Sequence, residues 1–248
     1  MTNEPLSPAD QKKLAARFAI DDLVARGEIA NGMKLGLGTG STAMPAVARL
    51  AELLRSGSLS GIRAVATSFQ TTIACEELGI PVFSLNSREI GGCLDLAIDG
   101  ADEITPDKRL IKGGGAALLL EKIVAYNAAR FVIVADASKA VPSIGVKFPL
   151  PVEVVAEARV SATRSLERLG AEVRLREGVR KAGPVVTDNG NLILDCLWKP
   201  GTAGARPFDP DEMESLINAV AGVVENGLFT RNVPAVYIAR ADGSVDRR

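Results

Sequence analysis

The chain has 248 residues, of which 47% are hydrophobic, 24% are charged and 4% are aromatic, and its formal net charge at pH 7 is −1. This composition fits a globular protein with one large domain, or one large and one small domain, and it excludes a disordered chain and a collagen-like fibre. The scattered, balanced charges give no basis for binding a nucleic acid, and no apolar run reaches the roughly 18 residues that a membrane span needs.

Helices and short apolar strands alternate from the N-terminus to about residue 136. Ser7 predicts the cap of a first helix, which has Pro8 in its first turn and continues to about Arg26. Further helices are expected at 43–55, at 71–78 and from the glycines at 113–115 to about 128. Strands are expected at 34–37, 62–66, 81–85, 94–98 and 131–135. The alternation is typical of an α/β fold with an open, mostly parallel, Rossmann-like sheet and helices on both faces. Ligands bind such sheets where the strands end.

The pattern changes near Phe148, where an antiparallel α+β arrangement begins. Strands are expected at 152–155, 171–176 and 185–197, with helices at 158–169 and 209–220. The run TDNGN, between two apolar segments, predicts a hairpin turn. Strands at 223–229 and 235–238 are expected to return to the main sheet. We therefore predict an α/β catalytic domain of residues 1–147 and 223–248, and a small ferredoxin-like domain of residues 148–222 that serves oligomerisation.

The sequence contains no histidine. Acid–base catalysis near neutral pH must then use Asp, Glu, Lys, Cys or Tyr, and mechanisms built on Ser-His-Asp or on histidine-bound metals are excluded. The three cysteines are odd in number and far apart, which suggests neither a disulfide framework nor a zinc site. Because the N-terminus is also polar and lacks the pattern of a signal peptide, we expect a reducing, cytoplasmic location.

A glycine-rich run, GLGTGST at 36–42, lies between a predicted strand and a predicted helix. Backbone N–H groups and hydroxyls in such a loop can surround an anion. The run departs from the spacing of the dinucleotide fingerprint and lacks the lysine of a P-loop, so a small phosphate or a sugar hydroxyl fits it better than a nucleotide. A plain tight turn with a Ser or Thr cap is the alternative.

An acidic run, DGADE, follows the apolar strand LDLAI and contains Asp99, Asp102 and Glu103. Crowded carboxylates at the end of a buried strand repel one another, which raises the pKa of at least one and suits proton transfer. A solvated turn is one alternative. A Mg²⁺ site is another, but no second acidic motif stands at a suitable spacing.

The run KGGGAALLLEK places Lys112 before three glycines that allow a ligand close to the backbone. Glu121 lies in the helix that follows, with apolar neighbours one turn away. Such a carboxylate either pairs with a cation or has its pKa raised by desolvation, as a general base requires. A structural ion pair and a partly exposed helix edge are the alternatives.

The run VADASK ends another apolar strand and carries Lys139 to the same edge of the predicted sheet. A lysine there can hold a phosphate as a point charge. An ordinary surface lysine is the alternative interpretation.

The runs GLGTGST, DGADEI, KGGGAALLLEKI and VADASK, in this order, closely resemble the motifs of the type A ribose-5-phosphate isomerases. The later runs FPLPVEVV, VTDNGNLILD and VVENGLF also resemble that family, and the resemblance covers about residues 10–240. It implies an aldose–ketose isomerase that interconverts D-ribose 5-phosphate and D-ribulose 5-phosphate. It also implies a homodimer or larger oligomer that needs no metal and no organic cofactor. The reaction serves both the pentose phosphate pathway and carbon fixation.

The resemblance further implies roles for single residues. Glu121 would be the base that moves a proton between C1 and C2, and Lys112 would support the developing oxyanion. Asp99 and Asp102 would assist ring opening and proton movement on the hydroxyls. Substrate and phosphate would be bound by two glycine-rich segments and two lysines: Thr39, Gly40, Ser41, Thr42, Gly113, Gly114, Gly115, Lys139 and, in a register that Lys13 makes ambiguous, Lys12.

Two segments depart from the family pattern. Leu119 and Leu120 stand where members commonly have a Thr-Arg pair, and ATSFQTT replaces a serine-rich run that ends in Asp, which affects the expected hydroxyl contacts and the subunit interface. Two other functions fit the same fold. An amino-sugar phosphate isomerase/deaminase generally uses a histidine for ring opening, and none is present. A non-catalytic sugar-phosphate sensor normally carries a DNA-binding module, for which the chain has no room, and lacks the base.

Overall fold

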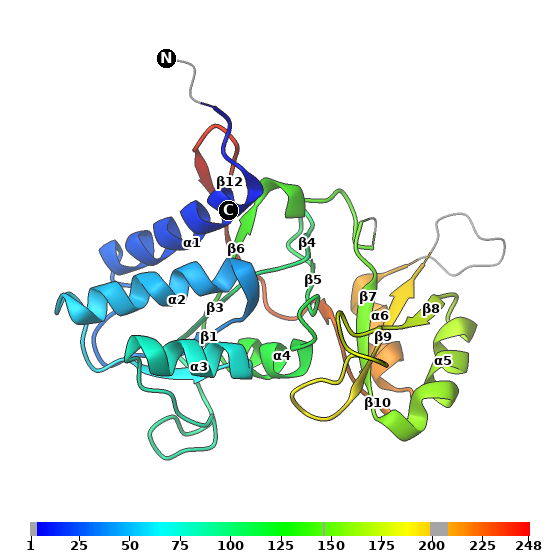
Figure 1. Cartoon of the computed structure of the whole chain (residues 1–248). Helices are drawn as coiled ribbons and strands as arrows, with labels where there is room; N and C mark the ends of the chain where they lie inside the picture. Colours follow the sequence, from blue (N-terminus) through cyan, green and yellow to red (C-terminus); the bar gives the residue numbers. More distant parts are fainter. Residues whose placement is uncertain (1–3, 146, 199–207) are drawn as a thin grey trace. The chain divides into compact units, whose positions relative to one another are not determined.

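The computed structural model describes residues 4–145, 147–198 and 208–248, which form two compact units (Figure 1). Unit 1 comprises Met1–Ala101, Leu120–Lys139 and Asn232–Arg248. Unit 2 comprises Asp102–Leu119 and Ala140–Arg231. The second unit therefore begins at the acidic run rather than at residue 148, and it retains the chain up to residue 231.

Unit 1 is built on a six-stranded sheet in the order β13-β12-β6-β3-β1-β2. Its strands are β1 (Lys34–Leu37), β2 (Arg63–Ala66), β3 (Leu96–Asp99), β6 (Phe131–Asp136), β12 (Ala235–Ala239) and β13 (Val245–Arg247). All neighbours pair in parallel except β13, which runs antiparallel at the edge. The order in which the chain adds strands to the sheet reverses between β1 and β3. Open sheets of this kind bind ligands at such a reversal point.

Helices cover both faces of this sheet, as the sequence predicts. On one face α1 (Pro8–Ala25), α2 (Gly40–Arg55) and α3 (Phe69–Leu78) lie side by side (Figure 1). Leu35 and Leu37 of β1 belong to the buried cluster beneath these helices. Between them Gly36 faces the other side, towards α4 (Leu118–Tyr126), where an added Cβ would lie 2.3 Å from Val124 Cγ1. The alternation of side chains along a strand thus gives β1 one helix layer on each face.

Two expected elements differ from the observed ones. The expected strand at 81–85 is wrong, because only Val82 forms a bridge, to Ala64, at the sheet edge before a turn begins at Ser84. The expected long helix after the glycines is shorter and begins later, at Leu118. A turn precedes it: Ala116 donates its N–H to Gly113 O at 3.0 Å, with its own φ at 59°.

Unit 2 contains a four-stranded antiparallel sheet in the order β10-β7-β9-β8. In chain order its elements are β7 (Leu150–Val154), α5 (Arg159–Arg168), β8 (Glu172–Leu175), β9 (Leu192–Leu197), α6 (Pro210–Asn218) and β10 (Val223–Asn226). This βαββαβ succession confirms the predicted ferredoxin-like arrangement. The predicted TDNGN turn is present as well: Thr187 donates its N–H to Asn191 O at 2.9 Å.

A second, three-stranded sheet of unit 2 joins the acidic run to the end of the ferredoxin-like part. It consists of β4 (Glu103–Ile104), β5 (Leu110–Ile111) and β11 (Leu228–Phe229), in the order β11-β5-β4. The expected return of 223–229 to the main sheet is therefore wrong: β10 pairs with β7 and β11 pairs with β5. Only the following strand, β12, joins the main sheet as expected.

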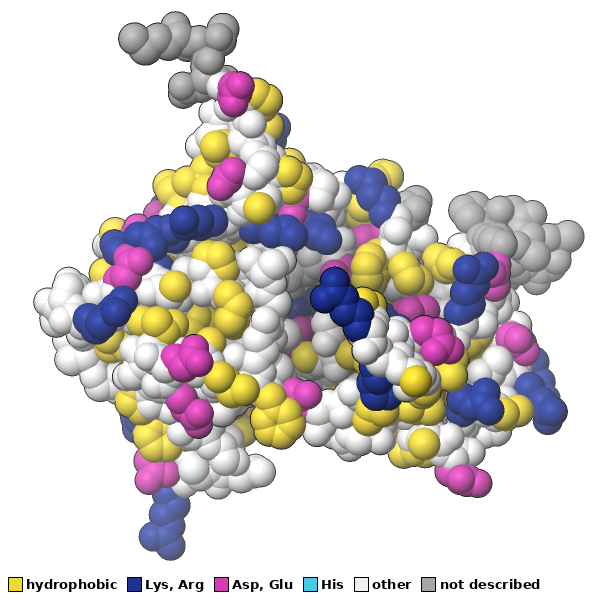
Figure 2. All heavy atoms as spheres, viewed as in Figure 1, with side chains coloured by type: hydrophobic (Ala, Val, Ile, Leu, Met, Phe, Trp, Pro, Cys, Tyr) yellow, Lys and Arg dark blue, Asp and Glu magenta, His cyan; other side chains and the backbone are white. Residues whose placement is uncertain are grey.

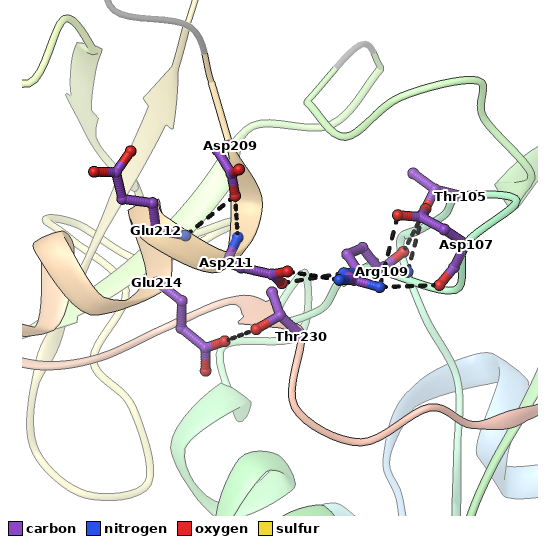
Figure 3. A network of polar contacts seen from close by, with 8 residues as sticks. All are labelled: Thr105, Asp107, Arg109, Asp209, Asp211, Glu212, Glu214 and Thr230. Carbon is purple, nitrogen blue, oxygen red and sulfur yellow. Dashed lines mark hydrogen bonds and ion pairs between the residues drawn. The ribbon is translucent and has the colours of Figure 1, made fainter.

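A polar network ties the β4–β5 hairpin to the first turn of α6 (Figure 3). Arg109 Nη2 lies 2.6 Å from Asp211 Oδ2, and Arg109 Nε lies 3.1 Å from Asp211 Oδ1. The Arg109 guanidinium lowers the pKa of the Asp211 carboxyl. Asp209 caps the same helix by accepting the N–H of Asp211 at 2.9 Å. The ion pair thus fixes one helix of the ferredoxin-like part to the segment that follows the acidic run.

Basic and acidic side chains are interspersed over the visible face in Figure 2 rather than gathered into a single patch. Among the described residues, no helix combines the length and the apolar character that crossing a bilayer requires.

Candidate active site

The glycine-rich loop after β1 and the aspartate that ends β3 meet at the reversal point of the unit 1 sheet. Leu37 and Ile98 are partners in the parallel ladder, so Gly38 and Asp99 follow at neighbouring strand ends. Asp99 is 4% exposed, and its Oδ1 accepts the N–H of Gly100 at 2.7 Å and the N–H of Thr39 at 3.3 Å. The buried carboxylate therefore holds the start of the loop.

This contact requires a glycine at position 38, because a side chain there would overlap with Asp99. An added Cβ at Gly38 would lie 1.9 Å from Asp99 Oδ1 and 2.7 Å from Asp99 Cα. The loop packs directly on the aspartate with no room for a side chain, and a similar approach brings Gly100 against Thr42, 3.1 Å from an added Cβ.

The N-terminus of α2 carries the hydroxyls and N–H groups of the GTGST segment. Thr39, the N-cap, donates its hydroxyl to Gln70 Oε1 at 2.9 Å, and Gly40 donates its N–H to the same oxygen at 3.0 Å. Gln70 belongs to the ATSFQTT run and was not among the predicted site residues. Lys12 of α1 places Nζ 3.3 Å from Ser41 Oγ, so the structure brings this lysine to the loop.

Glu121 is buried in α4, as the apolar helix face predicts. The residue is 4% exposed, and Val124 and Ala125 one turn later are also buried. Lys139 stands in a short 3-10 helix, Ala137–Lys139, directly after β6 and is half-buried. Because β6 pairs in parallel with β3, Lys139 after β6 lies at the same edge of the sheet as Asp99 at the end of β3.

The other predicted residues lie in unit 2, around the KGGG run. Asp102 Oδ2 accepts the N–H of Gly114 at 2.8 Å. Lys112 is 2% exposed, donates its backbone N–H to Gly227 O at 2.9 Å and places Nζ 5.5 Å from the centre of the Phe229 ring. Each of the two aspartates of the DGAD segment thus accepts an N–H of one glycine-containing loop, Asp99 in unit 1 and Asp102 in unit 2.

The glycines of the KGGG run are fixed by close contacts. Gly113 has φ at +104°, and an added Cβ would lie 2.8 Å from Leu118 Cβ. An added Cβ on Gly114 would lie 2.7 Å from Asp102 Oδ1. Sequence reasoning anticipated close approach to the backbone here, but it missed Arg176, which donates to the carbonyls of Gly113 and Gly114.

Glu103, the third carboxylate of the acidic run, has other hydrogen-bond partners than Asp99 and Asp102. It is 0% exposed and accepts the backbone N–H groups of Gly145, Lys147 and Phe148 at 2.5, 2.6 and 2.8 Å. The expected crowding of three carboxylates is therefore not observed at Glu103, which anchors the segment leading into β7. Across the described residues, no cluster of three or more Cys, Asp or Glu side chains could hold a metal ion.

Comparison with known proteins gives a consistent result. The family model described as ribose 5-phosphate isomerase A (phosphoriboisomerase A) matches residues 63–243. The ribose-5-phosphate isomerase A of Treponema denticola is 60% identical over 235 residues, covering 95% of this chain and 97% of its own. A D-ribose-5-phosphate isomerase solved in complex with phospho-erythronic acid is 38% identical with a TM-score of 0.88, covering 98% of this chain and 99% of its own. The ribose 5-phosphate isomerase A of Methanocaldococcus jannaschii is 38% identical with a TM-score of 0.85, covering 98% and 100%.

Proposed function

Because this chain belongs to the ribose 5-phosphate isomerase A family, we propose that it interconverts D-ribose 5-phosphate and D-ribulose 5-phosphate. The relatives that carry this name match nearly the whole chain, and the motifs that resemble the family contain the buried Asp99, Lys112 and Glu121. Buried ionisable side chains are rare and gather at functional sites, which supports a catalytic role for these three.

The reaction moves a proton between two neighbouring carbons of the open-chain sugar. A base removes the proton from C2 of the aldose, and the electron pair passes to the carbonyl oxygen on C1, so that an enediolate with negative charge on O1 forms. Transfer of the hydroxyl proton from O2 to O1, with return of the carbon-bound proton to C1, gives the ketose. We assign the transfer between the carbons to Glu121, a residue that is 4% exposed, because exclusion of water keeps the abstracted proton from exchanging away.

The enediolate carries negative charge that the enzyme must stabilise. Lys112 suits this role because the residue is 2% exposed, so solvent screens the charge of its ammonium group little. Those N–H groups of the neighbouring glycine run that are not bound to Asp102 are further donors for the same charge. A positive group and oriented N–H groups that are already in place need little reorganisation as the charge develops.

The two aspartates suit the proton movements on oxygen. Asp99 accepts the N–H of Thr39 and Asp102 accepts the N–H of Gly114, which helps to fix the orientation of each carboxylate. A carboxylate held in this way can accept a hydroxyl proton during ring opening and return it later. Neither aspartate is needed to remove the carbon-bound proton in this scheme.

The phosphate is assigned to the N-terminus of α2 and two lysines. The 16-residue helix α2 offers N–H groups and the positive end of its dipole to an anion, and its first residues carry the Thr39, Ser41 and Thr42 hydroxyls. Lys12 lies at Ser41 and adds a positive charge there. Lys139 supplies a second positive charge after β6. Binding energy from the phosphate is remote from C1 and C2, so it can position the reacting carbons.

The proposal is carried by the buried Glu121 in a chain 60% identical to a protein named ribose-5-phosphate isomerase A. The test is a coupled assay with ribose 5-phosphate, with and without a chelator. We expect ketose formation that the chelator leaves unchanged. The absence of turnover of ribose 5-phosphate would contradict the proposal, and loss of activity with chelator would contradict the metal-free mechanism.

A further inference from the structure

Arg176 connects the ferredoxin-like sheet of unit 2 to the KGGG run. It follows β8, and its side chain is 14% exposed. Its Nη1 donates to Gly113 O at 2.9 Å and to Gly114 O at 3.2 Å. Its Nε donates to Asp195 Oδ2 of β9 at 2.9 Å, and Nη2 donates to Asp195 Oδ1 at 2.5 Å. The two sides of one guanidinium therefore bind a carboxylate and a pair of glycine carbonyls.

The backbone of Arg176 is itself held in place. Arg176 donates its N–H to Ile193 O at 2.9 Å and accepts the N–H of Val185 at 2.9 Å. Asp195 belongs to the β8–β9 ladder, in which it is the partner of Arg174. The planar fork of the guanidinium is thus oriented from a rigid sheet, which favours a precise effect on the loop that it contacts.

The contacts of Arg176 fix the orientation of two peptide groups. In a trans peptide the C=O and the N–H point in opposite directions. The peptide between Gly113 and Gly114 donates its N–H to Asp102 Oδ2 at 2.8 Å while its carbonyl accepts from Arg176. It is therefore clamped at both ends. The next peptide also directs its carbonyl to Arg176, so the N–H of Gly115 points away from the guanidinium.

Such a clamp matters because glycine has the greatest conformational freedom of all residues. A glycine run can present either carbonyl oxygens or N–H groups to a ligand. Carbonyl oxygens would repel an enediolate, whereas N–H groups stabilise it. The Arg176 guanidinium binds both carbonyls and Asp102 holds the N–H of Gly114, so of these two peptides the N–H of Gly115 is the donor that can serve a ligand.

We infer that Arg176 is a positioning residue for the enediolate, an assignment that rests on the isomerase function proposed above. It binds the carbonyls of Gly113 and Gly114 and thereby orients the Gly115 N–H and the adjoining Lys112, which receive the developing negative charge. Arg176 acts through the loop and touches no reacting atom. Its loss should weaken transition-state stabilisation more than substrate binding, because the phosphate is held elsewhere.

The strand that precedes Arg176, β8, provides a matched control. Arg174 lies two residues earlier, is 73% exposed and pairs with a carboxylate, Glu172, at 2.5 Å. No contact between Arg174 and the glycine carbonyls occurs among the described residues. Replacing Arg174 by Met removes a guanidinium and an ion pair from β8 but leaves the clamp intact, so it measures the cost of a lost arginine alone.

The test compares Arg176→Met, Arg176→Lys and Arg174→Met with the wild-type enzyme. The readouts are kcat and KM for ribose 5-phosphate, the inhibition constant of phospho-erythronic acid, and the thermal melt. Phospho-erythronic acid is the molecule held by the related solved isomerase, and its carboxylate offers anionic oxygens like those of an enediolate. For Arg176→Met we expect kcat to fall on the order of 10-fold and the inhibition constant to rise by a similar factor, with KM within about 2-fold.

Arg176→Lys keeps the positive charge but loses the fork, so it should recover part of the lost kcat. Arg174→Met should match the wild type in all three kinetic constants.

Equal kcat in Arg176→Met and the wild type would overturn the inference, as would a change confined to KM. Should Arg176→Met fail to fold, Arg176→Lys decides: a lowered kcat at unchanged KM supports the inference, and an unchanged kcat overturns it. An inactive wild type would refute the isomerase proposal together with this inference, whereas an active wild type with an equally active Arg176→Met refutes the inference alone.

Discussion

Substitution of Gly38 by alanine tests how the glycine-rich loop and the buried aspartate depend on each other. The new Cβ would lie 1.9 Å from Asp99 Oδ1, 2.1 Å from Asp99 Cγ and 2.7 Å from Asp99 Cα. Two of these atoms belong to the carboxylate and the third belongs to the backbone, so rotation of the side chain alone cannot relieve the overlap. Either Asp99 or the loop must move, and the contacts of Asp99 with Thr39 and Gly100 are then weakened.

The expected cost follows from these contacts. A hydrogen bond to a charged group contributes about 1.5–3 kcal/mol, and an extra methyl group in a packed site costs about 1–3 kcal/mol. The loss of one hydrogen bond together with the overlap therefore predicts a destabilisation of about 4 kcal/mol. In a protein of this size each kcal/mol lowers Tm by about 2–4 °C, so the predicted fall is about 8–16 °C.

Thermal melts and turnover of ribose 5-phosphate measure both consequences. Gly57→Ala is the matched control, because Gly57 has φ at +75° and nothing within 4 Å of an added Cβ. Its cost is backbone strain alone, about 1 kcal/mol, with activity unchanged. We expect Gly38→Ala to have a lower Tm and a lower kcat than the wild type. A Gly38→Ala variant with the Tm and kcat of the wild type would refute the reasoning that the loop is packed on Asp99.

Two further predictions concern Lys112 in the site and Glu52 in the helix layer of unit 1. Lys112→Ala should lower kcat on the order of 10²-fold with a smaller effect on KM; steady-state kinetics that show only a raised KM would make Lys112 a binding residue. Glu52 is bound by Arg17 and Arg49, whose hydrogen bonds lower its pKa from 4.5 to about 2. Its stabilising effect is therefore present above pH 4.5 and is lost as the pH falls towards 2. Over this range the Tm of the wild type should fall more steeply than that of Glu52→Gln, and parallel curves would show that the two arginines do not stabilise the folded state through Glu52.

Local signals predicted much of the fold. Ser7 caps α1 as expected, with its hydroxyl accepting the N–H of Asp10 at 3.2 Å. The expected strand at 34–37 coincides with β1. These elements are specified by capping residues and by the alternation of buried side chains, which act over a few residues. The ferredoxin-like succession of unit 2 could be predicted for the same reason.

Pairing between distant segments could not be predicted in this way. The run 223–229 is apolar enough for a buried strand, but nothing in it tells which sheet it joins. Pro81 lacks an N–H for a ladder, and the segment after it makes a single bridge rather than a strand. The shape of the glycine turn before α4 was also not predicted, because glycine permits several conformations equally well.

The same limit applies to the site. Motif order predicted that Asp99 and the glycine-rich loop lie at the ends of strands of one sheet, where ligands bind. That the two strands are direct neighbours comes from the structure. Arg176 carried no such signal: it lies 63 residues from Gly113 in the sequence, and the alternating run EVRLR resembles a solvent-facing strand edge. Gln70 was missed because its run departs from the family pattern. The homodimer, the role of the small domain in oligomerisation and the cytoplasmic location stay predictions; light scattering on the purified protein tests the first of them.

The central claim is that the Glu121 carboxylate transfers the carbon-bound proton, and Glu121→Gln tests it most directly. The glutamine keeps the size of the side chain but cannot accept the proton, so we predict a normal melt and a fall in kcat on the order of 10²-fold or more. A correctly folded Glu121→Gln enzyme that turns over ribose 5-phosphate at nearly the wild-type rate would contradict the account.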